Sequence, residues 1–216
     1  MKMNSANLIW ATPNGDNLLG YIARVSNPKA TPEDPSEKLI KYLIKHRHWS
    51  PFEMVSACVE IHTTRDISRQ LLRHRSFSFQ EFSGRYAEYE NVGENLREAR
   101  LQDHKNRQNS LPCEDAEVEQ RWKAAQQAVV ELSNRVYRES LDELGIAKEQ
   151  ARAILPEGLV PTKVYMVGSL RSWIHYWDVR RDPATQKEHR LVADSTYSAV
   201  ISKFPSVLGA LNEEVY

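Results

Sequence analysis

The sequence predicts a single domain of the mixed α/β class, of the α+β type, with a sheet packed against long helices. Its 216 residues are enough to bury one substantial core. Apolar and polar residues alternate from 54 to 62, the period of a strand with one buried face. Apolar residues recur every three or four positions from 114 to 144, the period of a helix. No linker, repeat or low-complexity tract interrupts residues 1–216.

The first third of the chain is predicted to hold two strands and one helix. The short apolar run 8–11 predicts an edge strand. After a loop at 27–35, Ser36 caps a helix that ends at 49–51, because the residue before a proline avoids the helical region. The second strand occupies 54–62. Its buried face is expected to carry Val55, Ala57, Val59 and Ile61.

A short helix and a long irregular region are predicted for the middle of the chain. Thr64 and Asp66 supply helix-start chemistry for a helix running through Leu72. Residues 74–89 are aromatic, polar and non-periodic, which predicts a structured loop leading into an extended segment. Residues 91–113 are polar and are predicted to be irregular.

Helices dominate the remaining predictions. The long helix runs from Glu114 to Leu144, and Gly145 is suited to follow its end. A second helix at 151–155 is stopped by Pro156. The apolar stripe of the long helix consists of Val118, Trp122, Ala125, Val129, Leu132 and Val136.

A strand and two helices complete the predicted order. The strand covers 164–167, and Ser169 caps the helix that follows it. The last helix is predicted at 184–203, with Pro205 ending it. The apolar face of the helix after Ser169 carries Leu170, Trp173, Ile174 and Trp177.

The composition argues against several classes of protein. Lysine plus arginine and aspartate plus glutamate both total 29, so the net charge gives no reason to expect a nucleic-acid or acidic-membrane partner. Two cysteines are too few for a disulfide framework. The N-terminus lacks the pattern of a signal peptide, and no apolar run approaches a membrane span of about 20 residues. A cytoplasmic location is expected, or the host cytoplasm for a viral source.

The densest chemical feature is residues 69–86, called here the arginine cluster. It holds four arginines, one histidine, one glutamate and three serines in 18 residues. Like charges this crowded repel one another unless an anion or acidic partners offset them. Arginine's planar fork of donors matches phosphate oxygens, and serine hydroxyls can complete such a cradle. The cluster therefore predicts an anion site.

The arginine cluster carries a resemblance to a known family. Arg73-His74-Arg75, then seven residues, then Ser83-Gly84-Arg85-Tyr86, resembles the sequence signature of the flavin-dependent thymidylate synthases. Other segments resemble the family in the same order, from about residue 20 to 190. They are His48 with Ser50-Pro51-Phe52-Glu53, Arg152 with Leu155-Pro156, and Leu170-Arg171-Ser172 through His175 to Arg180.

The resemblance implies the family's own fold, with a mixed or antiparallel sheet and long helices, and a homotetramer with sites shared between subunits. It implies FAD as cofactor, with reductive methylation of dUMP to dTMP for thymidylate biosynthesis. Methylenetetrahydrofolate would be the one-carbon donor and NADPH the reductant. No metal, nucleic acid or membrane partner is expected.

Motif positions assign the individual contacts. The resemblance places flavin contacts, with folate near the first, at His48, Ser50, Arg73, His74, Arg75, Glu81, Ser169, Leu170, Arg171 and His175. It places dUMP contacts at Gln70, Leu71, Leu72, Arg73, Glu81, Phe82, Ser83, Gly84, Arg85, Arg152 and Arg180.

Arg180 is the expected catalytic residue. C5 of uracil must become nucleophilic to accept a one-carbon unit, and negative charge develops in the ring as it does so. A guanidinium near the N3/O4 edge would stabilise that charge. The same helix carries Arg171 and His175 four residues apart, so they share one face, offset from its apolar stripe.

Other functions fit the sequence less well. A nucleic-acid module could stack bases on Phe77, Phe79, Phe82 and Tyr86, but such domains are usually basic. Ser83 has no evident base beside it in sequence. Cys113 precedes Glu114 and Asp115, acids that disfavour a thiolate nucleophile. The spacing of His46, His48 and His62 matches no strong zinc pattern, and no glycine-rich dinucleotide loop occurs.

Three departures from the family pattern stand out. Gln80 replaces a common asparagine, Ala184 stands where many relatives carry a histidine, and Pro183 lies in the same turn. These departures are expected to alter flavin or folate contacts near that turn. Residues 89–113 match no part of the family pattern, and their role is open.

Overall fold

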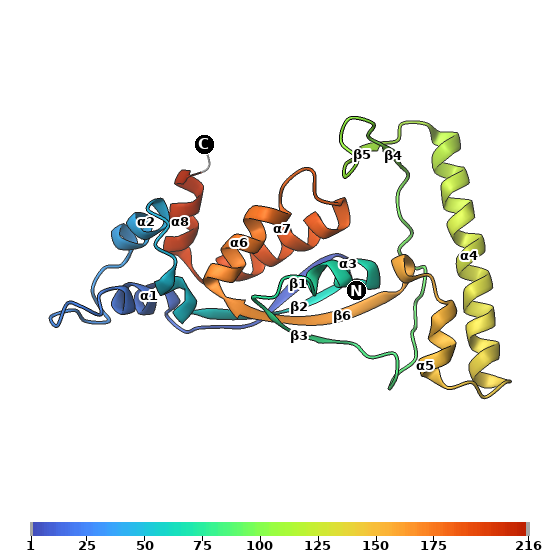
Figure 1. The fold of residues 1–216 in the computed structure, drawn as a ribbon, viewed down its shortest axis with the longest axis horizontal. Helices are drawn as coiled ribbons and strands as arrows, with labels where there is room; N and C mark the ends of the chain where they lie inside the picture. The colour runs from blue at the N-terminus through green and yellow to red at the C-terminus, as the bar shows by residue number, and fades with distance from the viewer. Residues whose placement is uncertain (1, 215–216) are drawn as a thin grey trace.

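An antiparallel sheet of four strands, in the order β1-β2-β6-β3, forms the centre of the computed structural model (Figure 1), which describes residues 2–214. The central pair, β2 and β6, is in register from Ser56 opposite Ser169 to Thr64 opposite Pro161. The strands are β1 (Ser5–Ala11), β2 (Ser56–Thr64), β3 (Ser78–Glu81) and β6 (Pro161–Ser169). The predicted edge strand is confirmed as β1.

Helices surround this sheet on one face and at both ends (Figure 1). Helices α6 and α7 cover one face, α1, α2 and α8 lie at one end, and α4 and α5 stand at the other. The α-helices are α1 (Gly15–Ala23), α2 (Glu37–Lys45), α3 (Arg65–Leu71), α4 (Ala116–Asp142), α5 (Lys148–Ala151), α6 (Leu170–Arg180), α7 (Lys187–Ile201) and α8 (Pro205–Glu214). Short 3₁₀ turns are η1 (Ser50–Met54), η2 (Arg152–Ile154) and η3 (Glu157–Leu159).

The alternation that predicted the second strand is confirmed, with a shift in its bounds. Ala57, Val59 and Ile61 of β2 are fully buried, and the intervening side chains are partly exposed. The strand begins at Ser56 instead of residue 54 because η1 bends the preceding chain. Val55, just before the strand, is also buried, and its carbonyl accepts a hydrogen bond from the Leu170 amide.

Prolines begin helical turns here where the sequence predicted that they would end them. The α2 helix stops at Lys45, because Arg47 adopts a φ of 55° and the chain turns there. Pro51 then lies in the first turn of η1. Similarly, α7 ends at Ile201 and Pro205 starts a further helix, α8. Proline is tolerated at the first turn of a helix because the backbone N–H that it lacks would have no hydrogen-bond partner within the helix there.

One helix and two short strands were also not predicted. The α1 helix contains Gly15 and Gly20, which are poor helix formers, so its sequence gives a weak signal. Both glycines are needed for packing: a Cβ on Gly20 would stand 1.9 Å from the Ser36 hydroxyl oxygen. Within the region predicted to be irregular, β4 (Arg100–Gln102) and β5 (Ser110–Pro112) form a small hairpin.

The long helix is confirmed as α4, but its apolar stripe is not buried. Asp115 caps it, accepting hydrogen bonds from the amides of Glu117 and Val118. Trp122 remains 43% exposed and Leu132 53% exposed. The side that packs on the chain is instead mostly polar, and its buried members are Gln126, Ser133 and Tyr137. No helix in the described range is long and apolar enough to cross a membrane.

The main core lies between the sheet and α6, and it fixes the position of the arginine cluster. Trp173 and Tyr176 of α6 are fully buried against Phe77. A smaller core, around Tyr89, Tyr137 and Leu155, joins the α4–α5 end to the sheet.

We predict that Gly168→Ala lowers the free energy of unfolding. The new Cβ would lie 2.5 Å from the Phe77 ring, so the ring must move within a packed core. Overpacking of this kind typically costs about 1–3 kcal/mol. Urea denaturation measures the change.

Gly209→Ala is the matched control for this substitution. Gly209 lies in α8 with nothing within 4 Å of an added Cβ. Alanine there should stabilise the protein by up to about 1 kcal/mol through helix propensity. Equal effects of the two substitutions would contradict the packing proposed for Phe77.

Candidate active site

Phe77 anchors the turn of the arginine cluster between α3 and β3. It is buried against Trp173, with ring centroids 4.7 Å apart, and lies over Gly168. Arg73 and Arg75 are exposed on the same turn. Within residues 2–214 neither arginine forms an ion pair. The turn therefore presents uncompensated positive charge from a fixed backbone.

Arg180 and His74 are in direct contact, as the end of α6 meets the turn after α3. Arg180 Nε donates to His74 Nε2 at 2.9 Å. A guanidinium can only donate, so His74 Nε2 must accept, and its ring proton must lie on Nδ1. Burial first, and then the charge of Arg180, lower the pKa of His74 to about 4. His74 is thus neutral near pH 7, with a single N–H donor.

A second histidine, His189, lies behind this pair and was missed by the sequence interpretation. It is fully buried, and its ring centroid is 6.3 Å from that of His74. Its Nδ1 is 3.0 Å from Gln70 Oε1. Burial, and then Arg180, lower the pKa of His189 to about 3. Nothing in the local pattern of α7 distinguishes it, because only the packing of α7 against α3 brings it to Gln70.

Glu81 on β3 is fixed by hydroxyl groups. Ser68 Oγ donates to Glu81 Oε1 at 2.8 Å, and Thr162 Oγ1 donates to the same oxygen at 3.1 Å. Arg69 Nη1 reaches Glu81 Oε2 at 3.5 Å, and its Nε bonds Glu157 at 3.1 Å. Glu81 is therefore held rigidly beside one arginine of the cluster.

The start of α6 forms another fixed group around Glu53. Arg171 Nη1 donates to Glu53 Oε1 at 2.7 Å, and Ser169 Oγ donates to the other carboxylate oxygen. The hydrogen bond from Arg171 is the largest cause of a lowered pKa for Glu53. Ser169 also caps α6, accepting from the Ser172 amide at 3.3 Å, as predicted. Ser50 is exposed at the start of η1, the turn that carries Glu53.

The last arginines of the expected dUMP site lie at the other end of the molecule. Arg85 Nε is 3.5 Å from Glu149, and Arg152 Nε donates to the Glu149 carbonyl at 3.3 Å. Both therefore lie at α5, which stands beside α4 and apart from α6 in Figure 1. A single chain thus divides the predicted substrate residues into two groups.

Some predicted contacts have buried side chains. Leu71 and Leu170 are fully buried, and Phe82 packs against Tyr89 with ring centroids 5.4 Å apart. Gly84 is buried where a Cβ would stand 2.2 Å from the Tyr89 ring. Within one chain, the side chains of Leu71 and Leu170 therefore face the core and not a ligand. Leu72 and Ser83 are half-buried.

The predicted division of α6 into two faces is confirmed. Arg171 and His175 are exposed, whereas Trp173 and Trp177 are buried. His48 is also exposed, 5.9 Å from Tyr42 between ring centroids. These exposed groups are accessible to a ligand or to another subunit.

The competing interpretations find little support in the geometry. Phe77 is only 8% exposed and cannot stack on a base. Cys113 lies just before α4, where its thiol bonds the Asp115 carbonyl at 3.7 Å. Ser83 Oγ is 3.4 Å from the Arg85 amide, from which it accepts. No group of three potential metal ligands occurs among residues 2–214.

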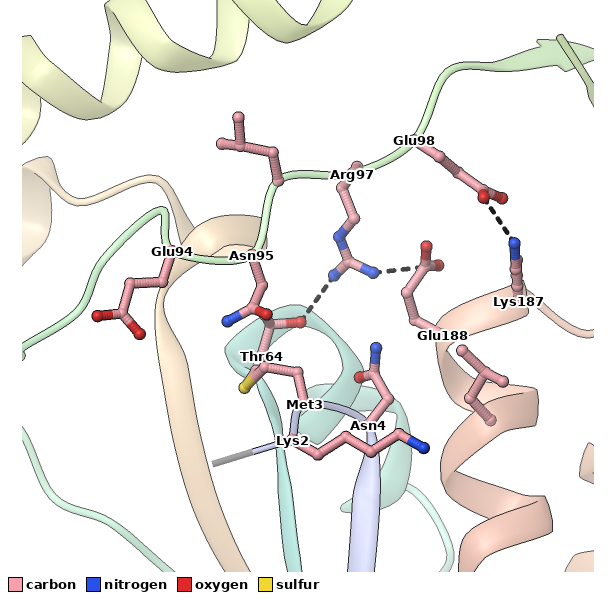
Figure 2. A pocket seen from close by; sticks show the side chains of 12 residues that line it. Lys2, Met3, Asn4, Thr64, Glu94, Asn95, Arg97, Glu98, Lys187 and Glu188 are labelled. Carbon is pink, nitrogen blue, oxygen red and sulfur yellow. Dashed lines mark hydrogen bonds and ion pairs between the residues drawn. The ribbon is translucent and has the colours of Figure 1, made fainter. Parts of the chain in front are cut away.

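Two cavities are lined by neither His74 nor Arg180. One of about 550 Å³ is bordered by Arg97, Thr64, Glu188, Lys187 and Glu98 (Figure 2). Its charges neutralise each other: Arg97 Nη1 is 3.0 Å from Glu188, and Lys187 Nζ is 2.6 Å from Glu98. The second, of about 460 Å³, includes only Phe82 of the predicted site residues.

Comparisons with known proteins identify relatives over nearly the whole chain. Residues 7–206 match the family model Thy1, described as "Thymidylate synthase complementing protein". A flavin-dependent thymidylate synthase from Synechocystis sp. is 52% identical over 204 residues, covering 93% of this chain and 90% of the relative. A probable flavin-dependent thymidylate synthase from Paramecium bursaria Chlorella virus 1 is 43% identical over 198 residues. The match covers 91% of this chain and 90% of the relative.

A solved structure shares the fold. It is the UMP/dUMP methylase PolB from Streptomyces cacaoi bound with 5-Br dUMP. The TM-score is 0.80 at 24% identity, and the match covers 99% of this chain and 97% of the other. The arrangement of sheet and helices is therefore that of a known fold, which confirms the predicted fold class.

His189, which is buried, and His74, which is half-buried, predict a loss of stability in mild acid. Both have a folded-state pKa below the ordinary value of 6.5, so the unfolded chain binds protons that the folded chain excludes. The free energy of unfolding should therefore fall as the pH drops below about 6.5. Between about pH 7 and about pH 5.5 each histidine should contribute roughly 1 kcal/mol, less for the partly exposed His74.

Urea denaturation of the wild type, His189→Leu and His104→Gln at the two pH values measures this fall in the free energy of unfolding. His189→Leu should lose at least half of the pH-dependent drop. The exposed His104 provides the control and should leave the drop unchanged. The same drop in wild type and His189→Leu would show that His189 does not exclude a proton.

Proposed function

This chain belongs to the flavin-dependent thymidylate synthase family, and from that membership and its geometry we propose that it methylates dUMP to dTMP with FAD as cofactor. Methylenetetrahydrofolate is the proposed one-carbon donor and NADPH the proposed reductant. FAD, when bound, supplies the hydride that completes the methyl group. The protein's own residues bind and orient the reactants and stabilise charge.

The contact between Arg180 and His74 is the observation that carries this proposal. Because His74 accepts from Nε, the guanidinium is held in one orientation with its Nη groups available. Negative charge that develops on the uracil ring as C5 becomes nucleophilic, before C5 attacks the one-carbon unit, would be stabilised by this fixed cation. The neutral His74 leaves the charge of Arg180 uncompensated.

The charge distribution also fits FAD and a nucleotide phosphate. Arg73 and Arg75 are exposed and make no ion pair within the described residues, so they can bind pyrophosphate oxygens. Arg171 and Ser169 are pre-oriented by Glu53 at the start of α6. Glu81, held by the hydroxyls of Ser68 and Thr162, offers a fixed acceptor on β3.

We also propose that the chain assembles into a homotetramer with sites at the subunit interfaces. Arg85 and Arg152 lie at the α5 end, away from Arg180, so one chain does not bring the expected dUMP residues together (Figure 1). The exposed stripe of α4 offers an apolar surface for another subunit. Each chain would act as one domain, and its two free thiols suit the cytoplasm.

The purified protein should be yellow, with a flavin spectrum, and should form dTMP from dUMP, methylenetetrahydrofolate and NADPH. Arg180→Ala should lower kcat by about 10²-fold or more, because it removes the fixed cation, while the flavin absorbance is retained. A colourless protein that FAD cannot reconstitute, and that makes no dTMP, would overturn the proposed function.

Arg181→Ala is the control for Arg180→Ala. Arg181 is the next residue, but it pairs with Asp194 at 2.8 Å and stacks over Tyr197 at 4.1 Å. Its removal should leave turnover near normal. Near-normal turnover of Arg180→Ala would remove Arg180 from the catalytic role.

Light scattering tests the assembly. The wild type should have the mass of four chains, and Leu132→Glu should lower it, because the substitution puts a charge into the apolar contact. Gln127→Glu adds the same charge to α4 away from the stripe, at an exposed position, and should leave the mass unchanged. An unchanged mass in Leu132→Glu would exclude this stripe as the interface.

A further inference from the structure

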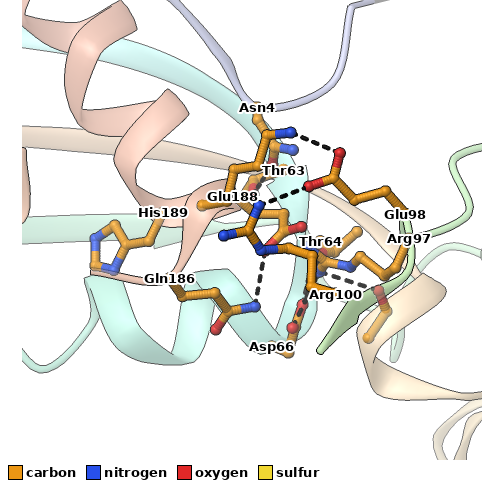
Figure 3. Close-up of polar contacts among 12 residues, drawn as sticks. Asn4, Thr63, Thr64, Asp66, Arg97, Glu98, Arg100, Gln186, Glu188 and His189 are labelled. Atoms are coloured by element: carbon orange, nitrogen blue, oxygen red, sulfur yellow. Dashed lines mark hydrogen bonds and ion pairs between the residues drawn. The ribbon is translucent and has the colours of Figure 1, made fainter. Parts of the chain in front are cut away.

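A chain of hydrogen bonds runs from Glu188 through two glutamines to the buried His189. Gln186 Nε2 donates to Glu188 Oε2 at 3.0 Å, and Gln70 Nε2 donates to Gln186 Oε1 at 2.8 Å. Gln70 Oε1 lies 3.0 Å from His189 Nδ1. Figure 3 shows Gln186, Glu188 and His189 at the start of α7, with Arg97 nearby.

The carboxylate at one end determines every donor and acceptor along this chain. Glu188 can only accept, and Arg97 Nη1 at 3.0 Å keeps it charged. The amide nitrogen of Gln186 must therefore face Glu188, and its oxygen must face Gln70. The nitrogen of Gln70 then faces Gln186, and its oxygen faces the histidine. His189 Nδ1 must carry the proton.

The far side of His189 supports this tautomer. His189 Nε2 is buried with no hydrogen-bond partner among the described residues, and so is the Tyr176 hydroxyl. The two rings are 5.8 Å apart. A proton on Nε2 would leave a buried donor unsatisfied and would set the Nδ1 lone pair against the Gln70 oxygen. Both penalties disfavour the alternative tautomer.

Three side chains close to His189 consequently keep donor groups that no hydrogen bond among the described residues uses. The second N–H of the Gln70 amide is not used by the chain of hydrogen bonds. His74 has its proton on Nδ1, because Nε2 accepts from Arg180. Arg180 keeps its Nη donors. We call Gln70, His74 and Arg180 the donor cluster.

We propose that His189 is a positioning residue that fixes the Gln70 amide as a donor, so that the donor cluster selects uracil over cytosine. The inference rests on the proposed function, since it takes a pyrimidine nucleotide as the ligand. Uracil presents a carbonyl oxygen at C4, which accepts from such donors. Cytosine presents an amino group there, and two donors would face each other. A site built to hydrogen-bond one of two analogues rejects the other strongly.

Without His189, only the contact with Gln186 still orients the Gln70 amide, so the amide rotates by half a turn, exchanging its donor for its acceptor, more readily than in the wild type. The flipped amide would accept from the cytosine amino group. Losing one oriented hydrogen bond of this kind is expected to change the preference between the two bases by about tenfold. If His189 had only a structural role, its replacement would weaken the binding of both nucleotides equally.

The experiment measures dissociation constants of dUMP and dCMP for the FAD-loaded protein by calorimetry, with melting temperatures recorded in parallel. Wild type should strongly prefer dUMP. His189→Leu should reduce the ratio of the two constants about tenfold or more. His189→Asn restores an N–H near the position of Nδ1 and should recover much of the preference. Thr196→Val, a buried change elsewhere on α7, should leave the ratio unchanged.

Should His189→Leu fail to fold, Gln186→Ala provides the same test from the exposed end. It removes the acceptor that holds the Gln70 nitrogen from the Glu188 side, so that His189 alone orients the Gln70 amide. A preference unchanged in every folded variant that breaks the chain would overturn the inference while leaving the proposed function intact. A wild type that binds neither nucleotide would instead refute the proposed function, and the inference with it.

Discussion

The hydrogen bond from Arg180 Nε to His74 Nε2 is the contact on which the arrangement of the site depends. It joins residues 106 positions apart in sequence. Because β2 and β6 are antiparallel, α3 and α6 start from opposite ends of this strand pair, at Thr64 and at Ser169. Their C-terminal ends consequently meet over the sheet. The core around Phe77 and Trp173 keeps that meeting point fixed.

Burial and positive charge act together on this contact. The low dielectric around His74 and His189 disfavours their charged forms, and the adjacent Arg180 disfavours them further. The neighbour of each neutral histidine then determines which ring nitrogen carries the proton. This neighbour is the Arg180 guanidinium for His74 and the Gln70 amide oxygen for His189. A site rich in nitrogen atoms thereby acquires a defined pattern of donors, with Arg180 as its permanent charge.

Two groups of predicted site residues lie at different ends of the molecule. The sheet and α6 hold Glu81, Ser169 and Arg171 through fixed hydroxyl and carboxylate contacts. The α4–α5 end carries Arg85 and Arg152, and it exposes an apolar helix face that one chain leaves uncovered. Apolar surface of this kind is costly in water. In the homotetramer that we propose, this face would bring the two groups of residues together.

The sequence alone determined the strand of Ala57, Val59 and Ile61, the long α4 and the capped α6, because their apolar periods are local. It also identified the arginine cluster and Arg180 through motifs. It missed α1, whose glycines hide the helical signal, and it placed chain breaks at Pro51 and Pro205, where helical turns begin. Only the tertiary structure decided which atoms meet: the orientation of Gln70, the protons of His74 and His189, and the exposure of the α4 stripe depend on contacts between distant segments, which no local pattern records.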